Sequence, residues 1–542
     1  MRLKPQEGGY LKSGFWTAQR PGWRHAIFVA AVLFVLRAWS FVTPIIDVDE
    51  PQFAGFAHAL MDGGVPYVAS LDTKPLGVYW FFAAVFSLFG RYNMEAVHAA
   101  TAVWVGLTAF FCYGIARRVY TSNAGFWAAL FYAVFSTAFV PKFIGTSIAV
   151  LMMLPLTMSI YMLIRWEESA KRLFVLFSGL LWGLACLFKY QAGINLVAVG
   201  FYLLLFRPLL FSRNSREVRL AEYAIFVSGG AAVGLLFAFY LYLAGAWDAF
   251  VFWSLKGSAA YVHKGSAQTS LLASFPLRGG AFILSTLLVW YLSARAIAAA
   301  ARGMLKEPGA ARPAEWIVII WLAFSFFAVL AGGKLYGHYF YQVLPQLCVL
   351  SGGCAFAFLS RPSRGPGRRS RAATAFFAAA LIVPAIGFFS ARLFADRIYS
   401  AVGEESPSSY ARASEYIRER TDPNDKIFVW GFATSVYHYS QRPSASRFLW
   451  SDWLTGRVSG TRSAKDPGFE TTEFIVPGSW DMFFDDMERN RPVYFVDTSP
   501  GNHHDYGKYP VSKYPKLLEF LEKNYALEAS IDGIDLYRRI RP

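Results

Sequence analysis

The chain has 542 residues, of which 55% are hydrophobic and only 16% are charged. Soluble domains are nearer ~45–50% apolar and ~25% charged, so the composition excludes a disordered chain, a coiled coil and an ordinary cytosolic enzyme. The formal net charge is +16, but residues 1–396 carry +18 and residues 397–542 carry −2. Because the polar C-terminal part is slightly acidic, the positive charge indicates membrane topology and excludes a nucleic-acid-binding surface.

Apolar runs predict eleven membrane-spanning helices. They are 26–44, 95–116, 122–140, 146–164, 173–188, 191–206, 221–244, 276–294, 314–331, 339–360 and 372–394. The run 76–90 has 15 residues, fewer than the ~17–25 that a span needs. If this run does not span and the N-terminus is inside, the predicted inner segments hold 23 Lys and Arg and the outer loops hold eight. The positive-inside rule therefore favours a helix at the outer interface for 76–90.

Three parts follow from this topology. Residues 1–25 are expected in the cytoplasm, 26–396 form the transmembrane domain with a first outer loop at 45–94, and 397–542 lie outside the cytoplasm. In the last part, the residue pattern predicts helices at 408–420 and 516–523 and strands at 426–430, 492–496 and 534–538. The expected fold class is an all-α polytopic membrane domain, with about eleven transmembrane helices, followed by a small α/β extracytoplasmic domain. The four cysteines lie in apolar runs and indicate neither disulfides nor a zinc site.

Three acids open the first outer loop, just past the end of the first predicted span. They are Asp47, Asp49 and Glu50, and Pro51 follows them. Carboxylates at this depth are costly unless they face water or a partner, so they are candidates for acid–base chemistry or for binding a divalent metal. The alternative is a polar cap of a helix that has Pro51 in its first turn.

Basic and aromatic residues gather at the outer ends of the predicted spans. They are Lys74, Tyr79, His98, Lys142, Lys189, Lys334, His338 and Tyr339. Each of them alone is typical of a side chain that reaches from the bilayer to the interface. Together they suit an anionic lipid head group held beside a water-filled cavity, because lysine binds phosphate as a point charge.

The order of motifs resembles a known family. A span is followed by Asp-Glu-Pro, then Lys-Pro-Leu-x-x-Tyr-Trp from Lys74, and much later Gly-Lys-Leu-x-x-His-Tyr-Phe-x-x-x-Leu-Pro, which ends at Pro345. This order is similar to that of the GT-C membrane glycosyltransferases, in the branch of protein O-mannosyltransferases and lipid A aminoarabinose transferases (glycosyltransferase family 39-like). The resemblance covers roughly residues 26–360. It is specific in the first outer loop and around Lys334–Pro345, and weak between them.

The resemblance implies transfer of a sugar from a polyprenyl-phosphate-linked donor at the outer face, with inversion. Asp49 matches the family's catalytic Asp, a general base, and Glu50 stands beside it. Lys74 matches a lysine implied to bind the donor phosphate, and Lys334 and His338 match the late element. Lys189 is expected to join the phosphate-binding group, Asp47 to be an auxiliary acid or a metal ligand, and Tyr79, His98, Lys142 and Tyr339 to be substrate contacts. The chain departs from the family at His98, where Arg is usual, and at Lys142 and Ser147, where the family has an Arg…Asp pair.

The expected partners are a polyprenyl-phosphate-linked sugar, the lipid bilayer, and a glycan, lipid or protein acceptor, with no nucleic acid. The expected location is a bacterial inner membrane, with the C-terminal domain on the periplasmic or extracellular side. No cofactor follows from the residues, and Mn²⁺ or Mg²⁺ at Asp47 and Asp49 is a competing account of the acids. Two other functions stay open, namely a transporter or flippase of lipid-linked glycans and a non-catalytic envelope assembly protein.

Overall fold

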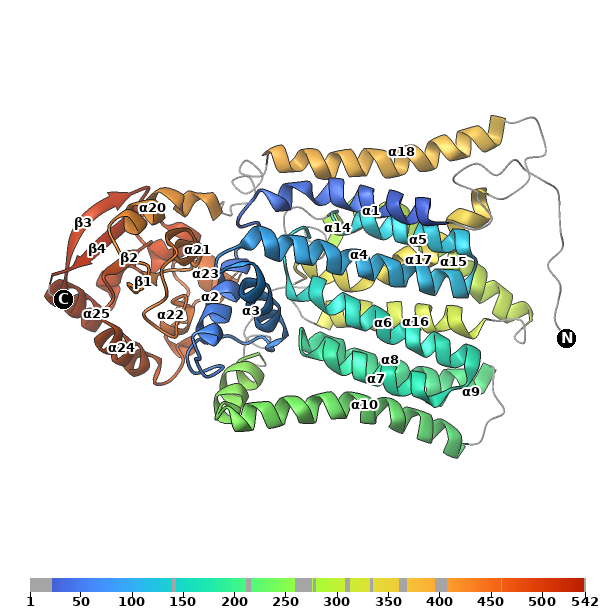
Figure 1. Cartoon of the computed structure of the whole chain (residues 1–542), viewed down its shortest axis with the longest axis horizontal. Helices are drawn as coiled ribbons and strands as arrows, with labels where there is room; N and C mark the ends of the chain where they lie inside the picture. Colours follow the sequence, from blue (N-terminus) through green and yellow to red (C-terminus); the bar gives the residue numbers. More distant parts are fainter. Residues whose placement is uncertain are drawn as a thin grey trace.

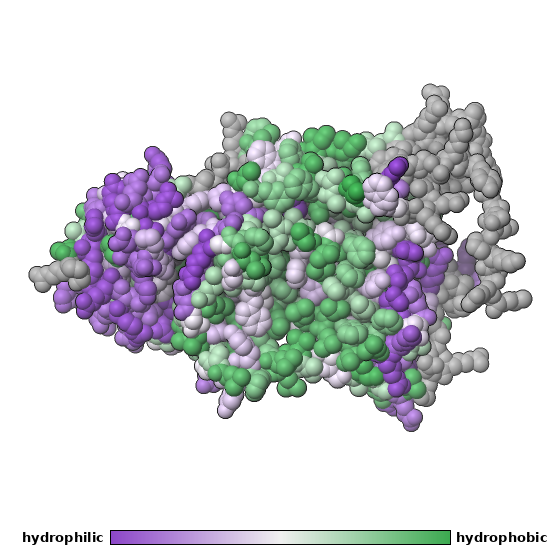
Figure 2. All heavy atoms as spheres, viewed as in Figure 1, coloured by the Kyte–Doolittle hydropathy of each residue, from purple (hydrophilic) through white to green (hydrophobic). Residues whose placement is uncertain are grey.

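The structure is a computed structural model. It describes residues 22–138, 143–210, 216–258, 275, 279–307, 312–331, 335–359, 368–394, 407–459 and 461–540. A helical bundle and a C-terminal α/β domain lie end to end along the long axis (Figure 1). Apolar residues cover the visible side of the bundle, and hydrophilic residues gather on the C-terminal domain (Figure 2). This arrangement confirms the predicted fold class of a multi-pass membrane domain followed by a small α/β domain.

In its described part, the bundle contains ten long apolar helices and three short ones. They are α1 (Trp23–Arg37), α4 (Met94–Val119), α5 (Ser122–Phe135), α6 (Ile148–Ser169), α7 (Arg172–Cys186), α8 (Ile194–Gly200), α9 (Arg207–Leu210), α10 (Arg216–Leu243), α14 (Gly280–Ser285), α15 (Leu287–Lys306), α16 (Pro313–Ala331), α17 (Leu344–Leu359) and α18 (Arg368–Ser390). Within the described ranges, seven helical segments are long and apolar enough to cross a membrane. The other predicted spans coincide with α5, α7, α14–α15 and α18, so the total of eleven stays a prediction.

Small residues let neighbouring helices of the bundle approach closely. A Cβ atom added at Gly179 of α7 would lie 2.0 Å from the carbonyl oxygen of Phe226 on α10. A Cβ at Gly352 of α17 would lie 2.3 Å from the carbonyl oxygen of Ala124 on α5. Close backbone contact of this kind replaces the hydrophobic effect as the source of helix association in lipid, so these glycines fix the packing of the bundle.

The first outer loop forms two helices, α2 (Glu50–Met61) and α3 (Gly77–Phe89). The second of them coincides with the helix predicted at the outer interface. Both lie at the end of the bundle that faces the C-terminal domain (Figure 1). The amide of Leu71 donates to the carbonyl oxygen of Arg447 at 3.1 Å, so the loop after α2 is tied directly to the C-terminal domain.

The C-terminal domain is built on a four-stranded sheet with the order β1-β2-β4-β3. The strands are β1 (Ile427–Trp430), β2 (Tyr494–Asp497), β3 (Tyr525–Ile531) and β4 (Ile534–Arg539), and the helices include α20 (Ala411–Glu419), α21 (Ser435–Ser440), α22 (Asp452–Thr455), α23 (Arg462–Lys465), α24 (Ser479–Asn490) and α25 (Pro515–Asn524). β1 and β2 are parallel and fully buried, while β4 pairs antiparallel with both β2 and β3. Asp532 and Gly533 have φ values of 55° and 76°, as a tight β3–β4 hairpin requires.

The three predicted strands correspond to β1, β2 and β4, and the two predicted helices to α20 and α25. β3 and α24 have no counterpart among the predicted elements.

Candidate functional site

Four segments far apart in the sequence meet where the bundle faces the C-terminal domain. They are the start of α2, the loop before α3, the turn after α7 and the short helix η8 (Gly337–Val343). The structure thereby gathers most of the residues singled out in the sequence at one end of the bundle. Lys142 and Lys334 lie outside the described residues, so their expected roles stay predictions.

Asp49 lies at the start of α2, and its carboxylate makes no hydrogen bond to the helix. It occupies the N-cap position, but its side chain makes no cap hydrogen bond. Instead, its own amide donates to Oδ1 of the neighbouring Asp47 at 2.9 Å. Pro51 lies in the first turn of the helix, as expected. The half-buried Asp49 carboxylate makes no hydrogen bond to any residue that the structure describes, which leaves it available for acid–base chemistry.

Glu50, in contrast, is fully buried and its carboxylate is saturated. Oε2 accepts from the amides of Ile46 (2.8 Å) and Asp47 (3.2 Å), and Oε1 accepts from the amide of Thr146 (2.6 Å). Nε2 of His98, on α4, lies 2.9 Å from Oε1. Burial raises the pKa of the Glu50 carboxyl, but the His98 charge and these hydrogen bonds outweigh burial and hold the pKa below its ordinary value. Glu50 is therefore placed to fix the backbone ahead of α2.

Arg37, at the end of α1, binds the backbone just before Thr146. Its guanidinium is fully buried and donates through Nη2 to the carbonyl oxygen of Ile144 at 2.6 Å. Thr146, two residues later, donates its amide to Glu50. The backbone from residue 143 to 146 is thus held between a buried cation and a buried anion. A Cβ at Gly145 would lie 3.0 Å from Glu50 Oε1, so a larger residue here would press on the Glu50 carboxylate.

Lys189 carries an unpaired positive charge in this region. It follows α7, its side chain is 7% exposed, and its ammonium makes no hydrogen bond within the described ranges. Nζ lies 4.2 Å from the centre of the Tyr339 ring, a cation–π distance. Burial lowers the pKa of Lys189 to about 7, and the negative charge of Asp49 opposes this shift. Asp49 and Lys189 are therefore oppositely charged neighbours, neither of which is satisfied by a hydrogen bond.

The late aromatic element contacts Lys189 through the Tyr339 ring. The His338 ring meets the Tyr339 ring edge-on at 4.8 Å and stacks on Tyr336 at 5.7 Å. Tyr336 donates its hydroxyl to the carbonyl oxygen of Ser459 at 3.0 Å. The C-terminal domain thus holds the chain segment that places Tyr339 against Lys189.

Lys74 is close to Lys189 through a chain of contacts, but its charge is already paired. Its Nζ lies 3.0 and 3.1 Å from the two carboxylate oxygens of Asp72. Ser254 donates to the carbonyl oxygen of Thr73 at 3.0 Å and shares a hydrogen bond with the hydroxyl of Tyr190, the residue after Lys189. The two lysine-bearing segments are therefore linked, with Lys189 as the less compensated cation.

Gly77 makes this linkage sterically possible. Its amide donates to the carbonyl oxygen of Leu187 at 2.8 Å, and a Cβ added at Gly77 would lie 2.5 Å from that same oxygen. Any side chain at this position would push the Lys74 loop away from the turn that carries Lys189. Tyr79, two residues later, is fully buried. Its ring stacks on that of Phe56 at a centroid distance of 3.9 Å, so it packs α3 against α2.

The acids of the loop offer few ligands to a metal ion. The oxygens of Glu50 are taken by amides and by His98, and Asp47 Oδ1 accepts from Asp49. Within the described ranges no group of three or more His, Cys, Asp or Glu could hold a metal ion. These donors do not fit a resident metal site, and the divalent-metal account stays a prediction for experiment.

Comparisons with known proteins bear on the family resemblance and on the fold. The model of a family described as dolichyl-phosphate-mannose-protein mannosyltransferase matches residues 73–242, which include Lys74 and Lys189. ArnT from Cupriavidus metallidurans, solved with undecaprenyl phosphate, is 15% identical, with 95% of this chain and 98% of that chain covered and a TM-score of 0.59. The chain has a GT-C glycosyltransferase fold. It resembles the mannosyltransferase and aminoarabinose-transferase branch of GT-C proteins, as the motifs predicted.

Two further GT-C structures are of archaeal origin. The Archaeoglobus fulgidus oligosaccharyltransferase, tethered with an acceptor peptide containing the NVT sequon, is 15% identical over 96% of this chain and 74% of that chain, with a TM-score of 0.59. AglB from the same organism, in complex with an inhibitory peptide and a dolichol-phosphate, is 14% identical with a TM-score of 0.57 and the same coverage. A comparison with curated protein sequences finds no match.

Sequence reasoning missed three residues of this region. Arg37 was read as part of an apolar span, although an ionisable residue inside a span is itself a functional signal. Ser254 and Tyr190 carry no sequence signal, because only the folded chain brings them to the Lys74 loop.

Proposed function

We propose that this protein is a membrane glycosyltransferase that moves a sugar from a polyprenyl-phosphate-linked donor to an acceptor at the outer face of a bacterial inner membrane. The observation that carries the proposal is the pair formed by Asp49 and Lys189. A half-buried carboxylate without hydrogen bonds acts electrostatically on a buried ammonium without hydrogen bonds. Buried charges are normally paired and hydrogen-bonded, so Lys189 is suited to a phosphate and Asp49 to an acceptor hydroxyl.

In the proposed reaction, Asp49 accepts the proton of the acceptor hydroxyl as the oxygen attacks C1 of the sugar. The bond between C1 and the phosphate oxygen breaks on the opposite face, so the configuration inverts and polyprenyl phosphate leaves. Lys189, with Lys74 and Lys334, stabilises the negative charge that develops on the leaving phosphate. A phosphate is a good leaving group, so no strong general acid is needed.

Glu50 and His98 take positioning roles in this proposal. Their fully buried pair, together with Arg37, fixes the backbone from which Asp49 projects. The contact of Tyr339 with Lys189, and that of His338 with Tyr339, favour a place for both rings beside the donor head group.

The test is a transfer assay in membranes with a lipid-linked sugar donor. Asp49→Asn should lower the turnover by ~10²–10⁴-fold, the usual contribution of a positioned base. Asp248→Asn, which changes an exposed acid in another loop, is the matched control and should keep normal turnover. Normal turnover of Asp49→Asn would contradict the role, and movement of the donor across the membrane without its consumption would favour a flippase. Loss of activity in EDTA that Mn²⁺ or Mg²⁺ restores would favour the metal account.

A further inference from the structure

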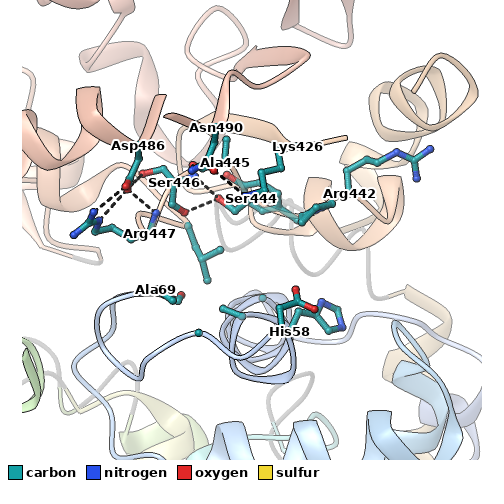
Figure 3. A pocket seen from close by; sticks show the side chains of 18 of the residues that line it. His58, Ala69, Lys426, Arg442, Ser444, Ala445, Ser446, Arg447, Asp486 and Asn490 are labelled. Carbon is teal, nitrogen blue, oxygen red and sulfur yellow. Dashed lines mark hydrogen bonds and ion pairs between the residues drawn. The ribbon is translucent and has the colours of Figure 1, made fainter. Parts of the chain in front are cut away.

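A cavity lies along one face of α2, between the first outer loop and the C-terminal domain (Figure 3). Its volume is about 400 Å³, within the range of ~300–1,000 Å³ typical of small-molecule sites. His58 and Ala69 come from α2 and the loop after it, and face Ser444, Ser446 and their neighbours from the C-terminal domain (Figure 3). Asp49 is not among the lining residues, so this cavity is distinct from the Asp49–Lys189 pair.

Small side chains on one face of α2 create the hollow. Ala54, Gly55 and Ala59 line it, at the spacing that places residues on the same face of a helix. Larger side chains would fill the space between the two domains. The helix that begins at Asp49 thus presents one face to the cavity and the opposite face to the bundle.

Three buried polar atoms of the lining make no hydrogen bond to any residue the structure describes. They are Nε2 of His58, Oγ of Ser70 and Nδ1 of His438. Their residues are only 8%, 2% and 7% exposed. Buried polar groups in proteins are nearly always hydrogen-bonded, so each exception needs an explanation. A ligand with several hydroxyl groups would satisfy all three atoms at once.

The charged residues of the lining, in contrast, are mostly satisfied within the protein. Asp486 accepts two hydrogen bonds from the Arg447 guanidinium at 2.8 and 2.9 Å. Arg442 donates to the carbonyl oxygens of its own domain and to Thr421. Lys426 donates to Oδ1 of Asn490 at 2.8 Å. Arg489 also lines the cavity and is exposed. The buried lining groups that remain for a ligand are uncharged, which favours a neutral polar molecule.

An aromatic side chain joins the two walls. The Tyr92 ring lies 4.3 Å from the His58 ring and 5.9 Å from the His438 ring. Its backbone has a φ of 62°, a left-handed conformation that is uncommon for a bulky residue and that concentrates at functional sites. Burial lowers the pKa of His58 to about 3 and that of His438 to about 4, so both rings are neutral near pH 7. Neutral imidazoles and an aromatic ring are groups that suit sugar hydroxyls and sugar faces.

We propose that this cavity binds a neutral saccharide through His58, Ser70 and His438, with Tyr92 as its aromatic wall. Resting on the proposed function, this saccharide is part of the acceptor, so the acceptor class is a glycan. The charges of Glu50 and His98 act on His438, so the cavity lies within electrostatic reach of the network that holds Asp49.

The experiment measures saturation-transfer NMR on the full chain in lipid nanodiscs with mannobiose, maltose and cellobiose. At least one disaccharide should give a signal, which His438→Phe and Ser70→Ala should reduce at least fivefold. Ala59→Leu, which fills the hollow without removing a polar group, should do the same. Ser440→Ala is the matched control, because this buried serine of α21 donates to Val436 and does not line the cavity. It should leave the signal unchanged.

Two further readouts separate the outcomes. Asp49→Asn should keep the signal, so the saccharide site is tested even if the transfer reaction fails. His438→Phe and Ser70→Ala should unfold at temperatures no lower than the wild type, because each removes a buried polar atom without a partner. No signal from any of the three disaccharides, equal signals in the wild type and His438→Phe, or a signal from a serine- and threonine-containing peptide alone would overturn the proposal.

Discussion

The imidazole of His98 lies 2.9 Å from the carboxylate of Glu50, and both side chains are completely buried. Nδ1 of the same ring lies 2.7 Å from the carbonyl oxygen of Ser40. Both ring nitrogens therefore face oxygen acceptors, the arrangement that a doubly protonated imidazolium satisfies. This pair ties α4 to the end of α1 and to the start of α2, and so fixes the segment that carries Asp49.

Breaking this pair should destabilise the protein strongly. His98→Leu leaves the Glu50 carboxylate buried without its cation, and the loss of one partner from a buried pair costs ~3–5 kcal/mol. Thr101→Val, on the same helix, removes a hydroxyl that donates to the Val97 carbonyl oxygen and contacts the Thr146 hydroxyl, and should cost about 1 kcal/mol. Unfolding in nanodiscs, followed by tryptophan fluorescence, measures both. Equal losses for the two variants would contradict an ionised His98–Glu50 pair.

Lys189 should lower the free energy of unfolding when no donor is bound, because its buried charge has no hydrogen bond to any described residue. The pKa of Lys189 is about 7 in the folded protein, against an ordinary value of 10.5. Between these pH values the unfolded chain binds more protons than the folded one, so the contribution of Lys189 to stability rises with pH from about 7 to about 10.5. Without donor, Lys189→Met should therefore unfold at a higher temperature than the wild type at pH 7, by about 2 °C or more.

Thermal unfolding of the wild type and of Lys189→Met from pH 7 to pH 10 tests the predicted direction of this stability change. The advantage of Lys189→Met should shrink as the pH rises. An advantage that is constant across this range, or a lower unfolding temperature for Lys189→Met at pH 7, would mean that the lysine is not buried as a costly charge.

Gly77 should be required for activity through its backbone contact. The Cβ of Gly77→Ala would lie 2.5 Å from the Leu187 carbonyl oxygen, so the Lys74 loop must move away from Lys189. A shift of 1 Å in a catalytic arrangement can cost ~10²-fold in rate, and we expect the transfer rate to fall at least tenfold. Gly193→Ala is the matched control, because its Cβ meets nothing within 4 Å. A transfer rate for Gly77→Ala equal to that of Gly193→Ala would show that the two loops need no close contact.

The sequence predicted the fold where one physical signal dominates. Long apolar runs set the bundle, and the alternation of turn residues with buried strands set β1 and β2. It missed β3, whose residues are largely exposed, so burial does not distinguish the strand. It also missed α24, whose first turn follows Gly478 at a φ of 75°.

The site was predicted only in part, because the sequence does not show which of its charged side chains are paired. The motifs named Asp49, Glu50, Lys74 and Lys189 as one group, and the structure brings them to one end of the bundle. The motifs could not distinguish a free lysine from a paired one. Asp72 pairs with Lys74, whereas Lys189 is left to the aromatic ring of Tyr339. Asp72 lies two residues before Lys74, whereas Tyr339 lies 150 residues after Lys189, so only the second contact depends on the folded chain.

The measurement that tests the central claim most directly is the binding of undecaprenyl phosphate to the purified chain in nanodiscs. Lys189→Met should weaken the Kd at least tenfold, about 1.4 kcal/mol, because it removes the buried ammonium proposed to bind the phosphate. Lys256→Met, which removes an exposed lysine from η5 (Phe250–Lys256), should leave the Kd unchanged. Equal affinities of the wild type, Lys189→Met and Lys256→Met would contradict a phosphate site at Lys189.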